Sequence, residues 1–149
     1  MRKYYVIIVL IFFSNCQTKS KNDVRGYFEN DLKISINNDE IYILIPIYDG
    51  KCTTAQNKTG EFLLNKPDIQ KKIHLIYIGT SKKELNLISK GLNEKYDLIY
   101  DFKNIGIKKD LIKFQPIVFI PNTEKDIKYE LSTRESFKRL KNDLINSVL

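Results

Sequence analysis

Cys52 is the residue of this chain whose type and position best suit chemistry. It opens residues 52–55 (CTTA) and directly precedes residues 53–66, whose pattern predicts a helix. Cysteine attacks as the thiolate, a form favoured by the unpaired N–H groups of a first helical turn and by the charge of neighbouring Lys51. Such a lone thiolate can attack a disulfide and form a mixed disulfide, but it cannot release its partner by internal attack. The open alternative is that Cys52 has no thiol function.

Other site chemistry finds little support, and we expect no metal and no cofactor. His74 is the single histidine and lies within an apolar run, where a packed or edge histidine is more common than a ligand. With Cys16 and Cys52 as the two cysteines, a four-cysteine zinc site is impossible. A Cys52–His74 pair for acyl transfer lacks an orienting third group. The sequence also has no phosphate-cradling glycine loop and no dinucleotide fingerprint.

Residues 1–15 have the pattern of a secretory signal peptide. Arg2 and Lys3 precede an unbroken apolar run at residues 4–13 (YYVIIVLIFF), which polar residues then close. A helix that spans a bilayer needs roughly 20 apolar residues, so this run is too short for one. The alternative is a buried strand or core helix at the N-terminus. We expect export.

Cys16, directly after this signal, resembles the lipid-modified cysteine of bacterial lipoproteins. In that family the cysteine becomes the mature N-terminus and carries several acyl chains, which anchor a protein stably. Residues 13–16 (FSNC) depart from the usual pattern, because Asn15 stands where Gly or Ala is common and Phe13 where Leu is. The resemblance implies a lipid-anchored protein of the bacterial cell envelope, with its domain facing the periplasm or the exterior and the membrane as a partner.

The rest of the chain is predicted to form a polar tether, residues 16–33, and one α/β domain, residues 34–149. The domain should have a central mixed sheet flanked by helices, in the order β-α-β-α-(β)-β-β-α. Residues 102–115 have no clear pattern, and the last two strands should pair as an antiparallel hairpin. The expected strands are 34–36, 41–47, 73–78, 98–101, 117–120 and 127–131, and the expected helices are 53–66, one from a capping box at Ser81 and one from a capping box at Ser132.

The charge balance is basic without indicating nucleic-acid binding. The 149 residues carry 25 basic and 18 acidic side chains, a net charge of +7, which falls to +5 once Arg2 and Lys3 leave with the signal. The lysines are scattered, and no aromatic RNA-binding box or arginine-rich arm is present. We therefore expect no nucleic-acid partner. The excess charge should form a solvated face, which could rest near anionic lipid.

The order of elements resembles the thioredoxin superfamily, especially its membrane-tethered bacterial members. The resemblance covers about residues 39–148. It rests on Cys52 at the head of the first helix, on Pro116 directly before a buried strand, and on the predicted strand within residues 96–101 (YDLIYD). In this family a cis-proline faces the active cysteine. The resemblance therefore implies a cis Gln115–Pro116 bond, with Pro116 in contact with Cys52.

The active-site motif of that family is incomplete in this chain. Redox-active relatives open the helix with Cys-x-x-Cys; here Cys52 matches the first cysteine and Ala55 stands where the resolving cysteine should be. The resemblance implies one-thiol exchange with exported thiol or disulfide proteins, with Cys52 as nucleophile and Lys51 stabilising its thiolate. The alternative is a non-enzymatic binding or assembly lipoprotein on a degenerate scaffold. A peroxide reductase is disfavoured, because Asp49 stands where that class has Thr.

Overall fold

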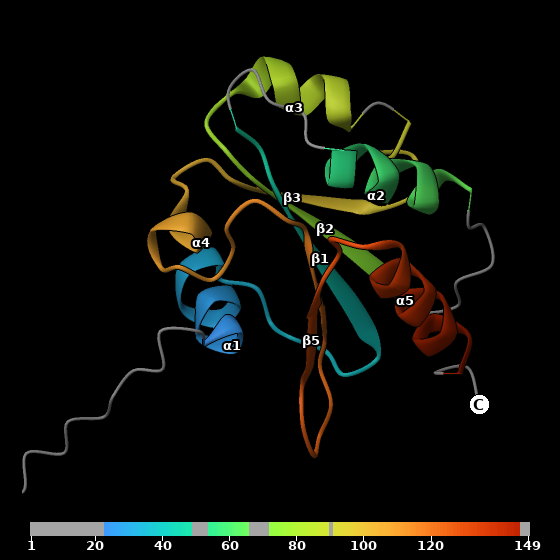
Figure 1. Ribbon diagram of the computed structural model, residues 1–149. Coiled ribbons are helices and arrows are strands. Elements are labelled where there is room, and N and C mark those ends of the chain that lie inside the picture. Colours follow the sequence, from blue (N-terminus) through green and yellow to red (C-terminus); the bar gives the residue numbers. More distant parts are fainter. Residues whose placement is uncertain (1–22, 49–53, 66–71, 90, 147–149) are drawn as a thin grey trace, which may run out of the picture.

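A computed structural model describes residues 23–48, 54–65, 72–89 and 91–146 (Figure 1). The signal segment and several residues singled out by the sequence, Cys16, Lys51 and Cys52, lie outside these described residues. The predictions that concern their surroundings therefore stay predictions.

The strands form one mixed sheet in the order β3-β2-β1-β4-β5. The first three strands run parallel, whereas β4 is antiparallel to β1, and β5 is antiparallel to β4. The α/β architecture with a mixed sheet flanked by helices, predicted from the hydrophobic pattern, is confirmed. The strands are β1 (Glu40–Pro46), β2 (Lys72–Ile78), β3 (Asp97–Asp101), β4 (Ile117–Ile120) and β5 (Ile127–Glu130).

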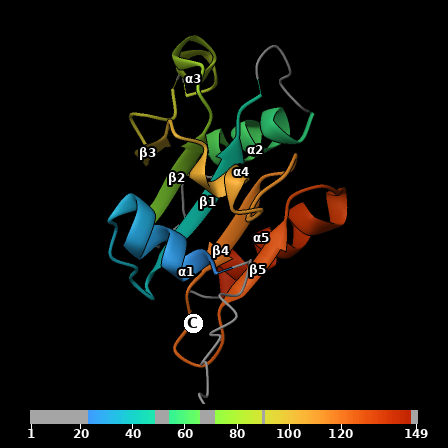
Figure 2. The ribbon, with the colours of Figure 1, turned by 90° about the vertical axis from the view of Figure 1, so that its left-hand side faces the viewer.

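Helices cover both faces of the sheet, as Figures 1 and 2 show. Leu63, Leu85 and Leu140 bring three of them to one face: α2 (Thr54–Leu64), α3 (Lys82–Ile88) and α5 (Arg134–Asn146). The other face carries α1 (Val24–Gly26), which continues into the wider-turned helix η1 (Tyr27–Leu32), and the short α4 (Ile105–Lys108).

The central strand β1 shows why its sequence is an unbroken apolar run. Ile41, Ile43 and Ile45 belong to the apolar cluster under α2, α3 and α5. Tyr42 and Leu44, which alternate with them, belong to the cluster under η1 and α4. Successive side chains of a strand point to opposite faces, so a strand covered on both sides must be apolar at every position.

The folded part of the chain begins earlier than the sequence predicted. Residues 16–33 were expected to be tether, but Tyr27 and Phe28 are fully buried in the core and Val24 is 5% exposed. The Asp23 side chain caps α1 by accepting a hydrogen bond from the Gly26 N–H at 2.8 Å. Residues 34–36, expected to be a strand, are not in the sheet. For residues 24–32 the tether prediction was wrong, because the polar stretch ends at Asp23 and apolar side chains then recur at helical spacing.

A buried carboxylate joins η1 and α4 to the sheet. Asp101, at the end of β3, is 2% exposed and accepts hydrogen bonds from the Tyr27 hydroxyl at 3.0 Å and from the Gly106 N–H at 2.9 Å. Burial and the nearby Asp101 carboxylate raise the pKa of Tyr27, which therefore stays a donor. A Cβ at Gly106 would lie 2.7 Å from Ile78 Cδ1 and 3.3 Å from the Tyr27 ring, so these buried side chains would have to shift to accept a larger residue.

Side-chain caps mark the starts of α3 and α5. The α3 cap is the predicted residue, and the α5 cap is one residue later than predicted. Ser81 caps α3 as expected, since its hydroxyl accepts from the Glu84 N–H at 3.3 Å. At α5 the reciprocal pair is Thr133 with Ser136 (3.2 and 3.1 Å), so the predicted box starting at Ser132 was wrong by one residue.

Candidate functional site at the carboxyl end of the parallel strands

The register brings the start of β4 to the carboxyl end of β1. Leu44 of β1 pairs with Ile117, the first residue of β4, and the two strands run antiparallel. Pro116, one residue earlier, therefore lies at the carboxyl end of β1, the end from which the chain continues to residues 49–53. In open α/β sheets, ligands bind at the carboxyl ends of strands, where the direction of connection changes. Here β2 lies on one side of β1 and β4 on the other.

An aromatic contact and one hydrogen bond join Tyr48, the second residue after β1, to the residues just before β4. The rings of Tyr48 and Phe114 lie 5.4 Å apart between centroids. The Tyr48 hydroxyl donates to the backbone carbonyl of Lys113. Burial raises the pKa of Tyr48, so the phenol stays neutral and can donate. Phe114 is 64% exposed, which leaves an aromatic surface at this edge.

A side-chain hydrogen bond joins the first turn of α2 to the carboxyl end of β1. Gln56, 2% exposed, donates from its side-chain amide to the carbonyl of Pro46, the last residue of β1. The helix begins at Thr54, so Cys52 precedes it by two residues of sequence and Ala55 is its second residue. The predicted helix at this position is thus confirmed, while the surroundings of Cys52 and Lys51 lie outside the described part.

Pro116 differs from the prediction in its peptide bond. It is buried, and its carbonyl accepts from the Leu131 N–H at 2.8 Å, which links the start of β4 to the end of β5. The described residues contain no cis peptide bond, so Gln115–Pro116 is trans and the cis-proline prediction was wrong. Only about 5–6% of X–Pro bonds in folded proteins are cis, and no signal in the local sequence sets this bond apart. Contact between Pro116 and Cys52 stays a prediction.

His74 lies near the amino end of β2, at the opposite end of the parallel strands. It contacts side chains that the sequence analysis did not predict to be its neighbours. Its ring stacks on Tyr42 with centroids 5.0 Å apart and an angle of 12°. Its Nε2 lies 3.0 Å from a Glu40 carboxylate oxygen and its Nδ1 lies 3.7 Å from one of Asp97. Glu40 and Asp97 are the first residues of parallel strands β1 and β3, and β2 brings His74 between them. The prediction of a packed histidine is confirmed.

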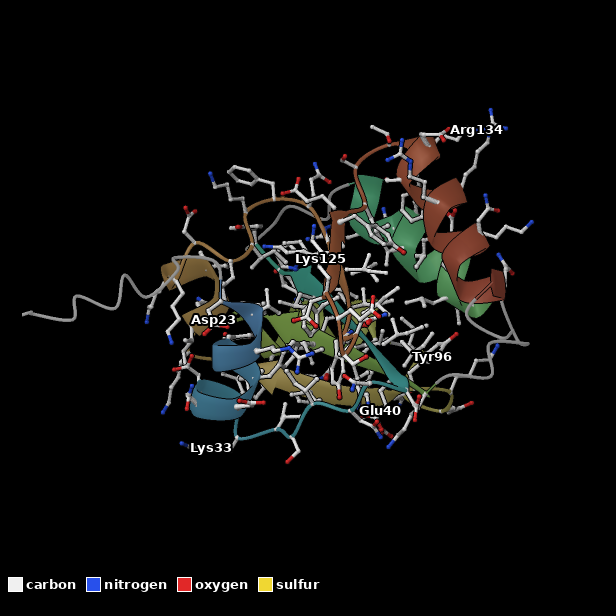
Figure 3. The ribbon with its side chains drawn as sticks, turned by 90° about the horizontal axis from the view of Figure 1, so that it is seen from below. Asp23, Lys33, Glu40, Tyr96, Lys125 and Arg134 are labelled. Carbon is white, nitrogen blue, oxygen red and sulfur yellow. The ribbon has the colours of Figure 1, made fainter. Side chains whose placement is uncertain are left out.

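Two further contacts complete this charged cluster. The Tyr42 hydroxyl donates to Glu40 at 2.7 Å, and Lys72 Nζ lies 2.6 Å from Asp97. The hydrogen bond from Lys72 lowers the pKa of Asp97. Glu40, labelled in Figure 3, is the first residue of β1, whereas Pro116 precedes Ile117, which pairs with Leu44 near the other end of that strand. A Cys52–His74 catalytic pair is therefore not supported, because His74 lies at the amino end of the strands and the chain reaches Cys52 from the carboxyl end of β1.

The described residues do not assemble a metal site or a membrane span. Within them, no three His, Cys, Asp or Glu side chains gather in a way that could hold a metal ion. In the same part of the chain, no helix is both long and apolar enough to cross a bilayer.

The sequence matches no protein-family model, and no curated protein is significantly similar to it.

Proposed function

We propose that this chain is an extracytoplasmic bacterial lipoprotein, anchored through Cys16, whose thioredoxin-like domain exchanges disulfides through the single thiol of Cys52. The observation that carries the proposal is the register of β1 and β4. It supports an arrangement in which Pro116 opens the strand beside β1, while the chain leaves the same end of β1 toward Cys52 and α2. The order of elements that resembles the thioredoxin superfamily also supports it.

The reaction proposed for Cys52 is a single nucleophilic displacement at a disulfide sulfur. Its thiolate attacks one sulfur of an exported disulfide, a new Cys52–S–S bond forms, and the old bond breaks. The released sulfur leaves as a thiolate that takes a proton from water. The exchange needs no net oxidant or reductant, because one disulfide replaces another. Release from Cys52 needs an external thiol, since Ala55 occupies the place of a resolving cysteine.

A second candidate is a binding or assembly lipoprotein without thiol chemistry. Two observations favour it: Ala55 cannot resolve a mixed disulfide, and the Gln115–Pro116 bond is trans where the redox family has a cis-proline. On this reading the scaffold and its anchor remain, and the aromatic edge at Tyr48 and Phe114 contributes to binding.

Restoring the Cys-x-x-Cys motif distinguishes disulfide exchange from a binding function without thiol chemistry. We expect Ala55→Cys to raise turnover in a disulfide-reduction assay with a protein substrate, because a second thiol in the Cys-x-x-Cys spacing can resolve the mixed disulfide. Ala55→Ser is the matched control, since it adds a side chain of similar size without a thiol, and Cys52→Ser should abolish any gain. If Ala55→Cys turns over no faster than Ala55→Ser and Cys52 alkylates no faster than a free cysteine, the exchange function is wrong and the binding lipoprotein takes its place.

A further inference from the structure

One short segment holds the whole net charge of the folded chain. Residues 23–149 carry 21 basic and 18 acidic side chains, a formal net charge of +3. Residues 102–114 (FKNIGIKKDLIKF) carry four lysines and one aspartate, which is also +3. The remainder of residues 23–149 is therefore formally neutral. We call residues 102–114 the basic segment.

The basic segment buries apolar side chains in the core and exposes its lysines to solvent. Leu111 and Ile112 are buried in the cluster under η1 and α4. The lysines are exposed, and aromatic rings are exposed at both ends of the segment: Phe102 at 41% and Phe114 at 64%. A positively charged surface bordered by exposed aromatic rings has the composition of helices and loops that lie in the interface of an anionic bilayer.

Carboxylates neutralise this surface only in part. Lys109 pairs with Asp31 of η1, and Lys113 lies 3.8 Å from Asp110 within the segment. Among the described residues, Lys103 and Lys108 have no carboxylate partner. Lys82 adds a further cation, 5.6 Å above the Phe102 ring.

Cys16 is close in sequence to α1, on the face of the sheet that carries this surface. The described part begins at Asp23, so six residues separate it from Cys16, and the seven Cα–Cα steps between the two span at most about 25 Å when fully extended. Asp23 caps α1, which lies on the same face of the sheet as α4 (Figure 2). Figure 3 shows Asp23 and Lys33 on one side of the sheet and Arg134, at the start of α5, on the other. A lipid on Cys16 would thus keep the basic segment within reach of headgroups.

We infer that the basic segment, with Phe102 and Phe114 at its ends, is a docking surface for the anionic headgroups of the bilayer that holds the protein. This inference rests on the proposed anchor at Cys16. Electrostatic attraction is screened beyond about 8 Å at physiological salt, so the short tether is what brings the surface close enough to bind. The contact fixes the domain with its η1 and α4 face toward the membrane.

A single tryptophan can report this contact, because the chain has none. The mature chain with Phe114→Trp is reconstituted into vesicles of phosphatidylcholine, or of phosphatidylcholine with phosphatidylglycerol, each with brominated acyl chains. We expect a blue shift and quenching of tryptophan emission on the anionic vesicles only, and loss of both at about 1 M salt, where the screening length is about 3 Å. Leu87→Trp is the matched control, since Leu87 is 67% exposed on α3, over the other face of the sheet, and its emission should stay unquenched.

Charge variants show whether the lysines carry the effect. Lys103→Gln, Lys108→Gln and Lys113→Gln, combined in the Phe114→Trp chain, should abolish the quenching. The control combines Lys58→Gln, Lys138→Gln and Lys141→Gln, three exposed lysines of α2 and α5, and should leave the quenching unchanged.

The outcomes distinguish this inference from the anchor. Vesicles that retain the Phe114→Trp protein at 1 M salt, while its tryptophan remains unquenched at low salt, overturn the docking surface and leave the anchor intact. Protein that washes off at 1 M salt, yet is quenched at low salt, supports the docking surface and contradicts the anchor. An emission shift with a DNA oligonucleotide equal to that with anionic vesicles overturns the inference in favour of nucleic-acid binding.

Discussion

The contact between Gly106 and Tyr27 shows how single residues join the elements of this fold. The Tyr27 ring lies 3.3 Å from where a Cβ at position 106 would be, and its hydroxyl donates to the buried Asp101 carboxylate. The Gly106 N–H donates to the same carboxylate. The two donors and the missing Cβ therefore work together to hold η1 and α4 against the end of β3.

Two glycine substitutions test this account with opposite expected signs. Gly106→Ala should destabilise the protein by about 1–3 kcal/mol, because its Cβ would lie 2.7 Å from Ile78 Cδ1 and force a shift of packed atoms. Gly60→Ala should stabilise it by about 1 kcal/mol, since Gly60 lies inside α2 and a Cβ there meets no atom within 4 Å. Urea unfolding of both variants and wild type gives the two free energies. Equal effects of the two substitutions would contradict the packing described for Gly106.

At the scale of elements, one ion pair joins the first helix to the β4–β5 hairpin. Arg25 of α1 donates from Nε and from a terminal nitrogen to the two carboxylate oxygens of Asp126, both at 2.6 Å. The two side chains are 38% and 28% exposed, so solvent weakens the pair but does not remove it. The hydrogen bond from Arg25 lowers the pKa of Asp126.

This ion pair predicts a pH-dependent stability difference. Arg25→Gln should cost about 1 kcal/mol near neutral pH, because bidentate geometry places the pair at the upper end for exposed ion pairs. A carboxyl with a lowered folded-state pKa stabilises above its unfolded pKa of about 3.9, and this contribution is lost as pH falls through the folded value. The gap between wild type and variant should therefore close in acid. Thermal unfolding across pH measures it, with exposed Lys138→Gln as control; a gap that stays constant into acid would contradict the assignment.

The sequence predicted the central elements well because their environment is simple. β1 and β2 are covered on both faces, so their largely apolar runs stand out, and Ser81 is a strong helix start. α1 and η1 were missed because their apolar residues are few and follow a polar stretch. Their burial depends on contacts with β3 and α4, far away in sequence. The cluster around His74 also depends on tertiary packing rather than on local pattern. The trans bond at Pro116 is the usual form of an X–Pro bond, and the cis prediction came from the family resemblance.

At the scale of the whole molecule, the two proposals give the protein a definite orientation. The anchor at Cys16, the short tether and the basic segment would hold the η1 and α4 face toward lipid. Figure 1 shows α2 and α5 on the other side of the sheet, turned away from that face. The end of the sheet that carries Tyr48 and Phe114 would then lie beside the bilayer.

Thiol titration of the mature protein tests the central claim most directly. Lipidation uses the sulfur of Cys16, so one free thiol per mature chain should remain, that of Cys52. We expect this thiol to react with a small disulfide at neutral pH several-fold faster in the folded protein than in urea, because the start of α2 and Lys51 favour the thiolate. Two titrating thiols would contradict the anchor, and a folded-state rate no faster than the unfolded one would contradict an exchange function for Cys52.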